Sequence, residues 1–237
     1  MSELHVPTIA ILASGSGTTA DALAHDIYDG KVSAEIGLVI ASKHDAGILD
    51  KAKKWNDELG FDVRTRVINS YTHPGFPQER GQTLQEAEVI CDLVESGRFS
   101  LVALLGYVHQ VNGVLVDEYG YVPGTYISPY QARMINTHPG ELPLTEDTYH
   151  IKTSIVTLDA YRAGKVTKGK HTVHVVSPGM DKGPVIAEHD VPIKSEYIIS
   201  AMGRMPANVA PIQAPTKPVS ANKESITRSR PNSVTKP

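Results

Sequence analysis

The stretch TIAILASGSGTTA, residues 8–20, joins a short apolar run to a turn rich in glycine and serine. An uninterrupted apolar run of this length is typical of a strand that is buried on both faces. After the turn, apolar residues recur at helical spacing as far as Gly30, namely at Ala20, Leu23, Ala24 and Ile27. The stretch therefore predicts a strand, a tight turn and a helix, which together begin an α/β unit.

The same alternation continues along the chain. Further strands are predicted at residues 35–42, 61–67, 101–105, 134–137, 171–176 and 184–191. Helices are predicted at residues 48–59, ended by Gly60, at 83–94 behind the capping box Thr83–Glu86, and at 151–161 with an inward face of Ile151, Ile155, Leu158 and Tyr161. Strands that alternate with helices predict an α/β, Rossmann-like, mostly parallel sheet with helices on both faces.

Composition separates the last part of the chain from the rest. The 237 residues are 41% hydrophobic and 21% charged with a net charge of −3, which excludes a disordered, collagen-like or strongly nucleic-acid-binding chain as a whole. Residues 205–237, however, hold 6 of the 16 prolines and no glycine, histidine or aromatic residue. We expect a catalytic domain at residues 1–200 and a basic, disordered tail at 205–237. Such a tail is usually a solvated end, and contact with nucleic acid or a membrane is the alternative.

Several features bear on the compartment of the protein. The single cysteine, Cys91, excludes an intrachain disulfide, and its apolar surroundings are typical of a buried residue. Residues 1–5 contain no cationic region, and no window approaches 18 apolar residues. We therefore expect a cytoplasmic protein without a signal peptide or a membrane span, and the sequence leaves its oligomeric state open.

The glycine turn after the first strand allows two interpretations. Residues 15–20 fit the pattern G-x-G-x-x-A, in which free N–H groups at a helix start attract a phosphate. The alternative is an ordinary turn with a Ser or Thr N-cap. A dinucleotide site would also need an acid at the end of the second strand, where this chain has Ala41-Ser42-Lys43-His44. A monophosphate ligand therefore fits better than NAD.

An amide and an imidazole stand two positions apart at Asn136 and His138. In a strand these positions share a face, and the two side chains supply the donors that stabilise an acyl-transfer oxyanion. Asp181 follows a later strand and could keep His138 protonated or orient it. A loop asparagine, a solvated histidine and an ordinary turn at Asp181 are the alternatives. No set of residues has convincing metal-ligand spacing.

Four segments together resemble the glycinamide ribonucleotide formyltransferase family, among the folate-dependent formyltransferases. They are ILASGSGTTADAL (11–23), ALLGYVHQV (103–111), INTHPGELP (135–143) and HTVHVVSPGMDKGPVI (171–186), and the resemblance spans residues 8–193. It implies transfer of formyl from 10-formyltetrahydrofolate to the amine of 5-phosphoribosyl-glycinamide in purine synthesis, with no metal. The partners would be these small molecules, not nucleic acid or a membrane.

The resemblance also implies roles for particular residues. Asn136, His138 and Asp181 match the catalytic residues of the family, and Gly17, Thr18 and Thr19 occupy its substrate-phosphate positions. The stretch that holds the folate corresponds to Val108, His109, Gln110 and Val111, together with Asn136.

The chain departs from the family pattern in two places. Residues 144–150 replace a loop rich in Pro-Gly and histidine, and the tail lacks the periodicity of a final amphipathic helix. A 10-formyltetrahydrofolate hydrolase, a methionyl-tRNA or sugar formyltransferase, and a non-catalytic nucleotide-binding module are the competing functions. The first would carry an added N-terminal domain, the second a C-terminal domain, and the third leaves Asn136, His138 and Asp181 unexplained.

Overall fold

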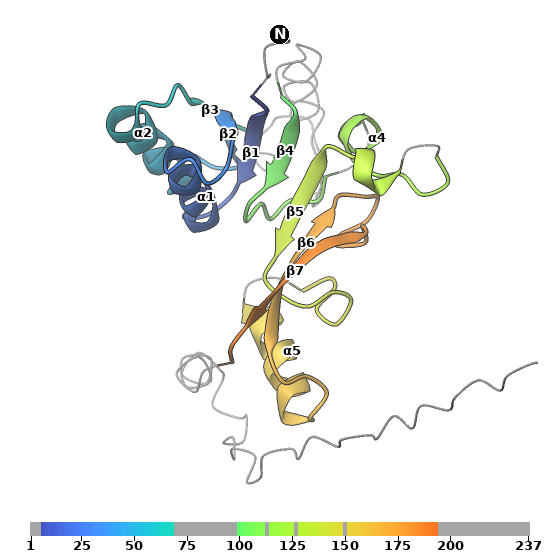
Figure 1. Cartoon of the computed structure of the whole chain (residues 1–237). Coiled ribbons are helices and arrows are strands. Elements are labelled where there is room, and N and C mark those ends of the chain that lie inside the picture. The colour runs from blue at the N-terminus through green and yellow to red at the C-terminus, as the bar shows by residue number, and fades with distance from the viewer. Residues whose placement is uncertain (1–5, 69–98, 112–113, 126–127, 149–150, 194–237) are drawn as a thin grey trace, which may run out of the picture. The chain divides into compact units, whose positions relative to one another are not determined.

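A seven-stranded mixed sheet forms the centre of the protein. The structure, a computed structural model, describes residues 6–68, 99–111, 114–125, 128–148 and 151–193. The strands run in the order β3-β2-β1-β4-β5-β6-β7 (Figure 1). They are β1 (Thr8–Ala13), β2 (Glu35–Ala41), β3 (Arg64–Val67), β4 (Leu101–Leu104), β5 (Met134–His138), β6 (Gly169–Val175) and β7 (Val185–Val191).

The strands pair in parallel from β3 to β5, and the last two pairings, β5 with β6 and β6 with β7, are antiparallel. The β6–β7 connection, residues 176–184, is shorter than the dozen or so residues that a parallel crossover needs. The α/β, mostly parallel fold class expected from the sequence is confirmed. The reversed direction of β6, which makes the last two pairings antiparallel, is an addition to that fold class.

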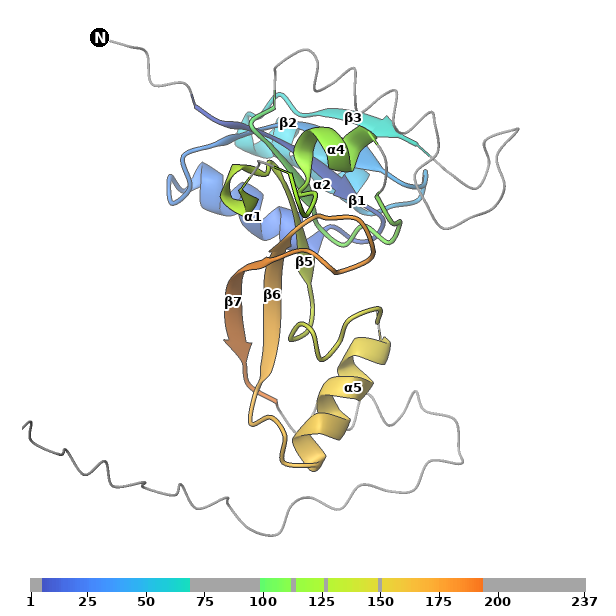
Figure 2. The same cartoon turned by 90° about the vertical axis from the view of Figure 1, so that its right-hand side faces the viewer.

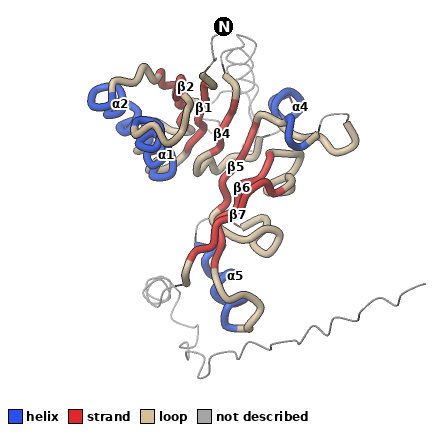
Figure 3. The backbone as a smooth tube through the Cα atoms, viewed as in Figure 1, coloured by secondary structure: helices blue, strands red, loops and turns tan. Residues whose placement is uncertain are grey.

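Helices cover both faces of the sheet, as Figures 2 and 3 show. The helices among the described residues are α1 (Thr18–Tyr28), α2 (Ile48–Leu59), α4 (Val114–Tyr119) and α5 (Ile151–Arg162), with a short 3-10 helix at Pro129–Gln131. Alternate residues of β1 belong to different cores because successive side chains of a strand point to opposite faces. Ile9 and Ile11 pack with α1 and α2, whereas Leu12 packs with Leu115 and Val116 of α4.

Two sequence predictions change in detail. The strand expected at residues 61–67 begins only at Arg64, because the Asn56 side chain hydrogen-bonds both the N–H and the carbonyl of Val63. The buried positions of α5 are Thr153, Leu158 and Ala160, whereas Ile155 and Tyr161 are only half-buried. The side chain of Ile151 is not described.

The glycine turn before α1 differs from an ordinary turn with a Ser or Thr N-cap. The N-cap is Gly17 with φ 70°, and no side chain caps this helix in the described structure. A Cβ at Gly17 would lie 2.5 Å from Cδ1 of Ile48, so only glycine fits there.

Several predictions fall outside the described residues: the helix and capping box at 83–94, the surroundings of Cys91, and the tail at 205–237. The chain divides into two units, residues 1–204 and 205–237, and every described residue lies in the first.

Candidate active site

Three turns meet beyond the carboxyl ends of β1, β4 and β5. The Ser14 N–H donates to the Gly106 carbonyl at 3.1 Å, and the Ser14 hydroxyl accepts from the Val108 N–H at 3.1 Å. These bonds fix the turn after β1 to the turn after β4. Asn136 and His138 lie in the last part of β5, the next strand of the sheet.

A cavity of about 350 Å³ opens at this edge of the sheet. Its wall contains all the predicted catalytic and folate-binding residues, namely Val108, His109, Gln110, Val111, Asn136, His138 and Asp181. Gly17, Thr18 and Thr19 are not among the lining residues that the described part of the chain provides. The structure thus brings two of the three predicted groups into one cavity and leaves the phosphate turn outside it.

The side chain of Asn136 donates to two partners. Asn136 lies opposite His174 in the antiparallel β5–β6 pairing, and its Nδ2 is 3.0 Å from Nε2 of His174 and 3.2 Å from Oδ1 of Asp181. His174 Nδ1 lies 3.0 Å from the Val175 carbonyl, which can only accept. Nδ1 of His174 therefore carries the hydrogen, and Nε2 accepts from Asn136.

His138 also has a partner at each ring nitrogen. Its Nδ1 lies 3.4 Å from Oδ2 of Asp181, and its Nε2 lies 2.9 Å from the hydroxyl of Thr145. His138 and Asp181 are both buried side chains. Asn136, His138 and Asp181 therefore form one hydrogen-bonded and electrostatic cluster, whose catalytic role remains a prediction.

Burial lowers the pKa of His138 below its ordinary value of 6.5. The charge of Asp181 raises this pKa, His174 lowers it, and a hydrogen bond with the Thr145 backbone raises it, but the net direction is downward. Neutral His138 is therefore favoured at pH 7. This result differs from the expectation that Asp181 keeps His138 protonated, because removal from water penalises the imidazolium more than the carboxylate favours it.

The loop that carries Asp181 is held tightly between β6 and β7. Asp181 has φ 55°, and the Val175 N–H donates to the Pro184 carbonyl at 2.9 Å. A Cβ on Gly183 would lie 1.6 Å from the Val175 carbonyl oxygen, so glycine is required where the loop passes the strand. The position of the Asp181 carboxylate thus depends on close backbone packing.

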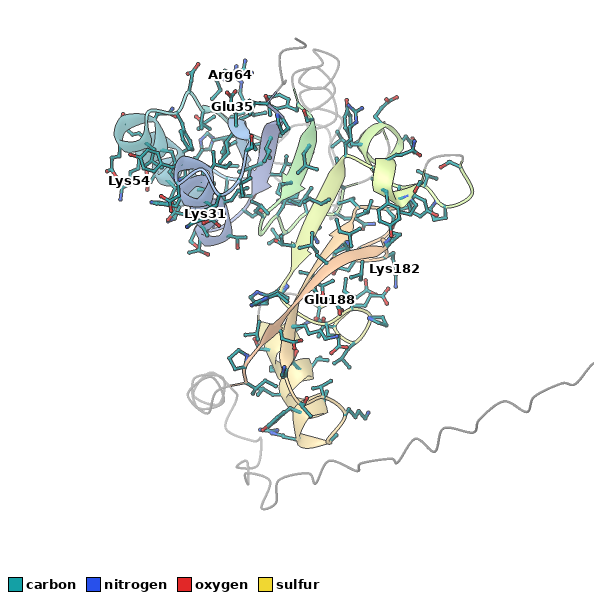
Figure 4. The ribbon with its side chains drawn as sticks, in the orientation of Figure 1. Lys31, Glu35, Lys54, Arg64, Lys182 and Glu188 are labelled. Carbon is teal, nitrogen blue, oxygen red and sulfur yellow. The ribbon has the colours of Figure 1, made fainter. Side chains whose placement is uncertain are left out.

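Lys182 joins this loop to the segment that replaces the usual family loop. Its Nζ forms an ion pair with Glu146 and lies 3.6 Å from Oδ2 of Asp147. Lys182 is labelled in Figure 4. The segment at residues 144–147 and the loop of Asp181 are therefore connected on the outside of the cavity.

The predicted phosphate turn is exposed at the start of α1. Thr18 and Thr19 are exposed, and Gly17 is buried against α2. A helix of this length offers its first N–H groups to an anion or to water when no side chain caps it. The geometry is compatible with phosphate binding, which remains a prediction.

Two residues near the catalytic cluster were not predicted as site residues. His174 lies two positions after Thr172 on β6, which places both on one face of the strand. Thr145 lies in a segment without periodicity, so no sequence signal identified it.

Neither a metal site nor a membrane span is found in the described structure. Among the described residues, no group of three or more His, Cys, Asp or Glu side chains could hold a metal ion. None of the helices in these residues has the length and apolar character needed to cross a membrane.

The strand order reverses between β1 and β4, and the cavity lies at the carboxyl ends of β4 and β5. This position is where open α/β sheets bind their ligands, and it defines the chain as an α/β protein of the ligand-binding, doubly wound class. The formyl transferase family model matches residues 8–212, and the chain belongs to the formyl transferase family. The family, fold class and transferase class expected from the sequence are confirmed.

The chain is also similar to individual proteins and to a solved structure. Phosphoribosylglycinamide formyltransferase of Bacillus subtilis is 26% identical over 184 residues, which cover 78% of each chain. The human trifunctional purine biosynthetic protein adenosine-3 is 28% identical over 187 residues, 78% of this chain but only 15% of that longer protein. The crystal structure of glycinamide ribonucleotide transformylase 1 from Geobacillus kaustophilus matches with a TM-score of 0.62 and 28% identity, covering 84% of this chain and 89% of that one.

Proposed function

We propose that this chain transfers the formyl group of 10-formyltetrahydrofolate to the amine of 5-phosphoribosyl-glycinamide. The observation that carries the proposal is the joint placement of Asn136, His138 and Asp181 in one cavity with residues 108–111. The donor would lie along residues 108–111, and the phosphate of the acceptor would bind at Gly17, Thr18 and Thr19.

The proposed reaction begins when the amine of the acceptor attacks the formyl carbon. The carbonyl electron pair moves to the formyl oxygen, and an N–H of Asn136 stabilises the resulting oxyanion. Both N–H groups of Asn136 already have protein partners, so the formyl oxygen would replace one of them, His174 or Asp181. Expulsion of N10 of the folate then restores the carbonyl.

A proton must move from the attacking amine to the departing N10. Both ring nitrogens of His138 already have protein partners, Asp181 at Nδ1 and Thr145 at Nε2, so the Asp181 carboxylate, which lines the cavity, accepts this proton. Neutral His138, whose Nδ1 is 3.4 Å from Oδ2 of Asp181, would hold the carboxyl group in place during the transfer. Return of the proton to N10 completes the transfer without a net change in the enzyme.

One assay separates transfer from hydrolysis. The protein is incubated with 10-formyltetrahydrofolate, with and without 5-phosphoribosyl-glycinamide, and loss of formyl from the folate is followed. Consumption only with the amine supports the proposal, whereas equal consumption without it indicates a hydrolase. No consumption in either case would contradict both activities.

The Asn136→Ala and His138→Ala variants are the companion test. Each should fold normally and lose orders of magnitude in turnover, since each removes a polar group of the reacting cluster. The exposed His189 on β7 offers a matched control, His189→Ala. Rates near those of the wild type in either site variant would overturn the catalytic assignment.

A further inference from the structure

Thr145 lies behind the catalytic cluster and is completely buried, at 0% exposed. Its hydroxyl oxygen is 2.9 Å from Nε2 of His138 and 2.9 Å from the Glu141 carbonyl oxygen. Thr145 is not among the described residues that line the cavity. Its hydroxyl therefore reaches the cavity through His138, which does line it.

A threonine hydroxyl has one hydrogen to donate and lone pairs that accept. The Glu141 carbonyl also accepts from the Thr145 N–H at 2.9 Å, so it keeps a hydrogen bond when the hydroxyl turns away. The hydroxyl hydrogen thus has two acceptors within reach, Nε2 of His138 and the carbonyl of Glu141. When it points to His138, the Glu141 carbonyl still accepts from the Thr145 N–H.

The two choices correspond to the two charge states of His138. Neutral His138 with its hydrogen on Nδ1, toward Asp181, has a lone pair on Nε2 that needs a donor. The imidazolium carries hydrogens on both nitrogens, and its Nε2–H needs an acceptor. We propose that Thr145 is a positioning residue that keeps His138 hydrogen-bonded in both charge states, donating to Nε2 in one and accepting from it in the other.

Close packing holds the hydroxyl of Thr145 in this place. A Cβ on Gly140 would lie 2.2 Å from Oγ1 of Thr145, and the Thr148 hydroxyl donates to the Thr145 carbonyl at 2.6 Å. The Thr172 hydroxyl donates to the Gly140 carbonyl at 2.6 Å. The hydroxyl can therefore rotate its hydrogen while its oxygen stays in position, as a group that serves both charge states must do.

The other groups that face His138 stay the same when Thr145 is changed. They are Asp181 on the β6–β7 loop, His174 on the neighbouring strand β6, and the backbone of Thr145 itself. Hydrogen bonds to charged groups are stronger than those between neutral groups. Loss of the Thr145 hydroxyl therefore costs the imidazolium more than neutral His138, and the pKa of His138 should fall.

The test uses the full chain with Thr145→Val, which keeps the side-chain shape, and Thr145→Ser, which keeps the hydroxyl. NMR of the histidine ring nitrogens reports the tautomer and pKa of His138. We expect the Nδ1–H tautomer in neutral wild-type protein and a fall of about one pKa unit in Thr145→Val. The kcat should fall about tenfold with both KM values within about twofold, and Thr145→Ser should restore kcat and pKa.

Unchanged tautomer, pKa and kcat in Thr145→Val would overturn the proposal. If that variant fails to fold, Thr145→Cys replaces it, because a thiol has nearly the shape of the serine side chain but is a weak hydrogen-bonding group. Thr145→Cys must then show the lower pKa that Thr145→Ser does not. The kinetic part rests on the proposed function, whereas the ring-nitrogen measurement stands without it, so failure of one is distinguishable from failure of the other.

Discussion

Nδ1 of His138 lies 3.4 Å from Oδ2 of Asp181, and these side chains are only 4% and 7% exposed. A carboxylate this close favours the imidazolium, while burial favours neutral imidazole. Burial has the larger effect here, and the pKa of His138 lies below 6.5. The pair is thus suited to accept a proton at neutral pH and to stabilise it once accepted.

Replacing the carboxylate should separate these two effects. In Asp181→Asn the side chain keeps its shape but loses the charge that raises the pKa of His138, so this pKa should fall further. Turnover should fall by about 10²-fold or more, because the carboxylate that accepts the amine proton is lost. An NMR titration of His138 and steady-state rates measure both effects. The control is Asp190→Asn, because Asp190 forms an exposed ion pair with Lys168. An unchanged pKa of His138 in Asp181→Asn would contradict the interpretation.

The lowered pKa also predicts how stability depends on pH. In the unfolded chain His138 titrates near 6.5, whereas in the folded chain it titrates lower, so below pH 6.5 the unfolded state binds more protons. The contribution of neutral His138 to the free energy of unfolding is fully present above pH 6.5. It is lost as the pH falls through the pKa that His138 has in the folded protein. Urea unfolding of wild type and His138→Asn between pH 7.5 and 5 should show a smaller loss of stability in the variant. The same comparison with His189→Asn should show no such difference.

The phosphate turn gives a prediction that does not involve the catalytic cluster. Thr18 and Thr19 are exposed at the start of α1, where no side chain caps the helix in the described structure. Thr18→Ala and Thr19→Ala should each raise the KM for 5-phosphoribosyl-glycinamide about tenfold, since a hydrogen bond to a charged phosphate is lost. The KM for the folate and kcat should not change, and stability should stay within about 0.5 kcal/mol. Thr65→Ala on exposed β3 is the control, and an unchanged acceptor KM in both variants would place the phosphate elsewhere.

The ion pair of Lys182 should contribute little to stability and should be sensitive to salt. The Lys182 side chain is 49% exposed and that of Glu146 25%, so water and ions screen the pair. Lys182→Met should lower the free energy of unfolding by less than about 1 kcal/mol at low salt, and the difference should vanish near 1 M salt. Denaturant titrations at both salt concentrations measure this, with Lys168→Met as the exposed comparison. A loss that persists in high salt would mean that Lys182 acts through packing.

The sequence predicted the parallel part of the fold because its signals are local. The apolar run at residues 8–13 and the helical spacing that ends at Gly60 depend only on neighbouring residues, and both elements occur as expected. The direction of β6 could not be predicted, since a buried strand has the same apolar pattern in a parallel or an antiparallel pairing.

The site could likewise be predicted only where its residues are close neighbours along the chain. Asn136 and His138 could be paired because residues two apart in a strand share a face. The contact of Asn136 with His174 depends on the antiparallel pairing of β5 and β6, which the sequence pattern does not contain. Thr145 reaches His138 through an irregular segment whose path no periodicity describes. The lowered pKa of His138 likewise follows from burial, a property of the assembled fold.

Gly183 provides the sharpest test of how the fold positions the site. A Cβ there would lie 1.6 Å from the Val175 carbonyl oxygen, and the loop that carries Asp181 would have to move away from β6. Gly183→Ala should therefore destabilise the protein by about 3 kcal/mol and lower turnover together, because the Asp181 carboxylate moves with the loop. Gly15→Ala is the matched control for stability, since a Cβ there meets no described atom within 4 Å. Thermal unfolding and the formyl-transfer assay measure both effects, and a stable Gly183→Ala variant with wild-type turnover would show that the loop does not fix Asp181.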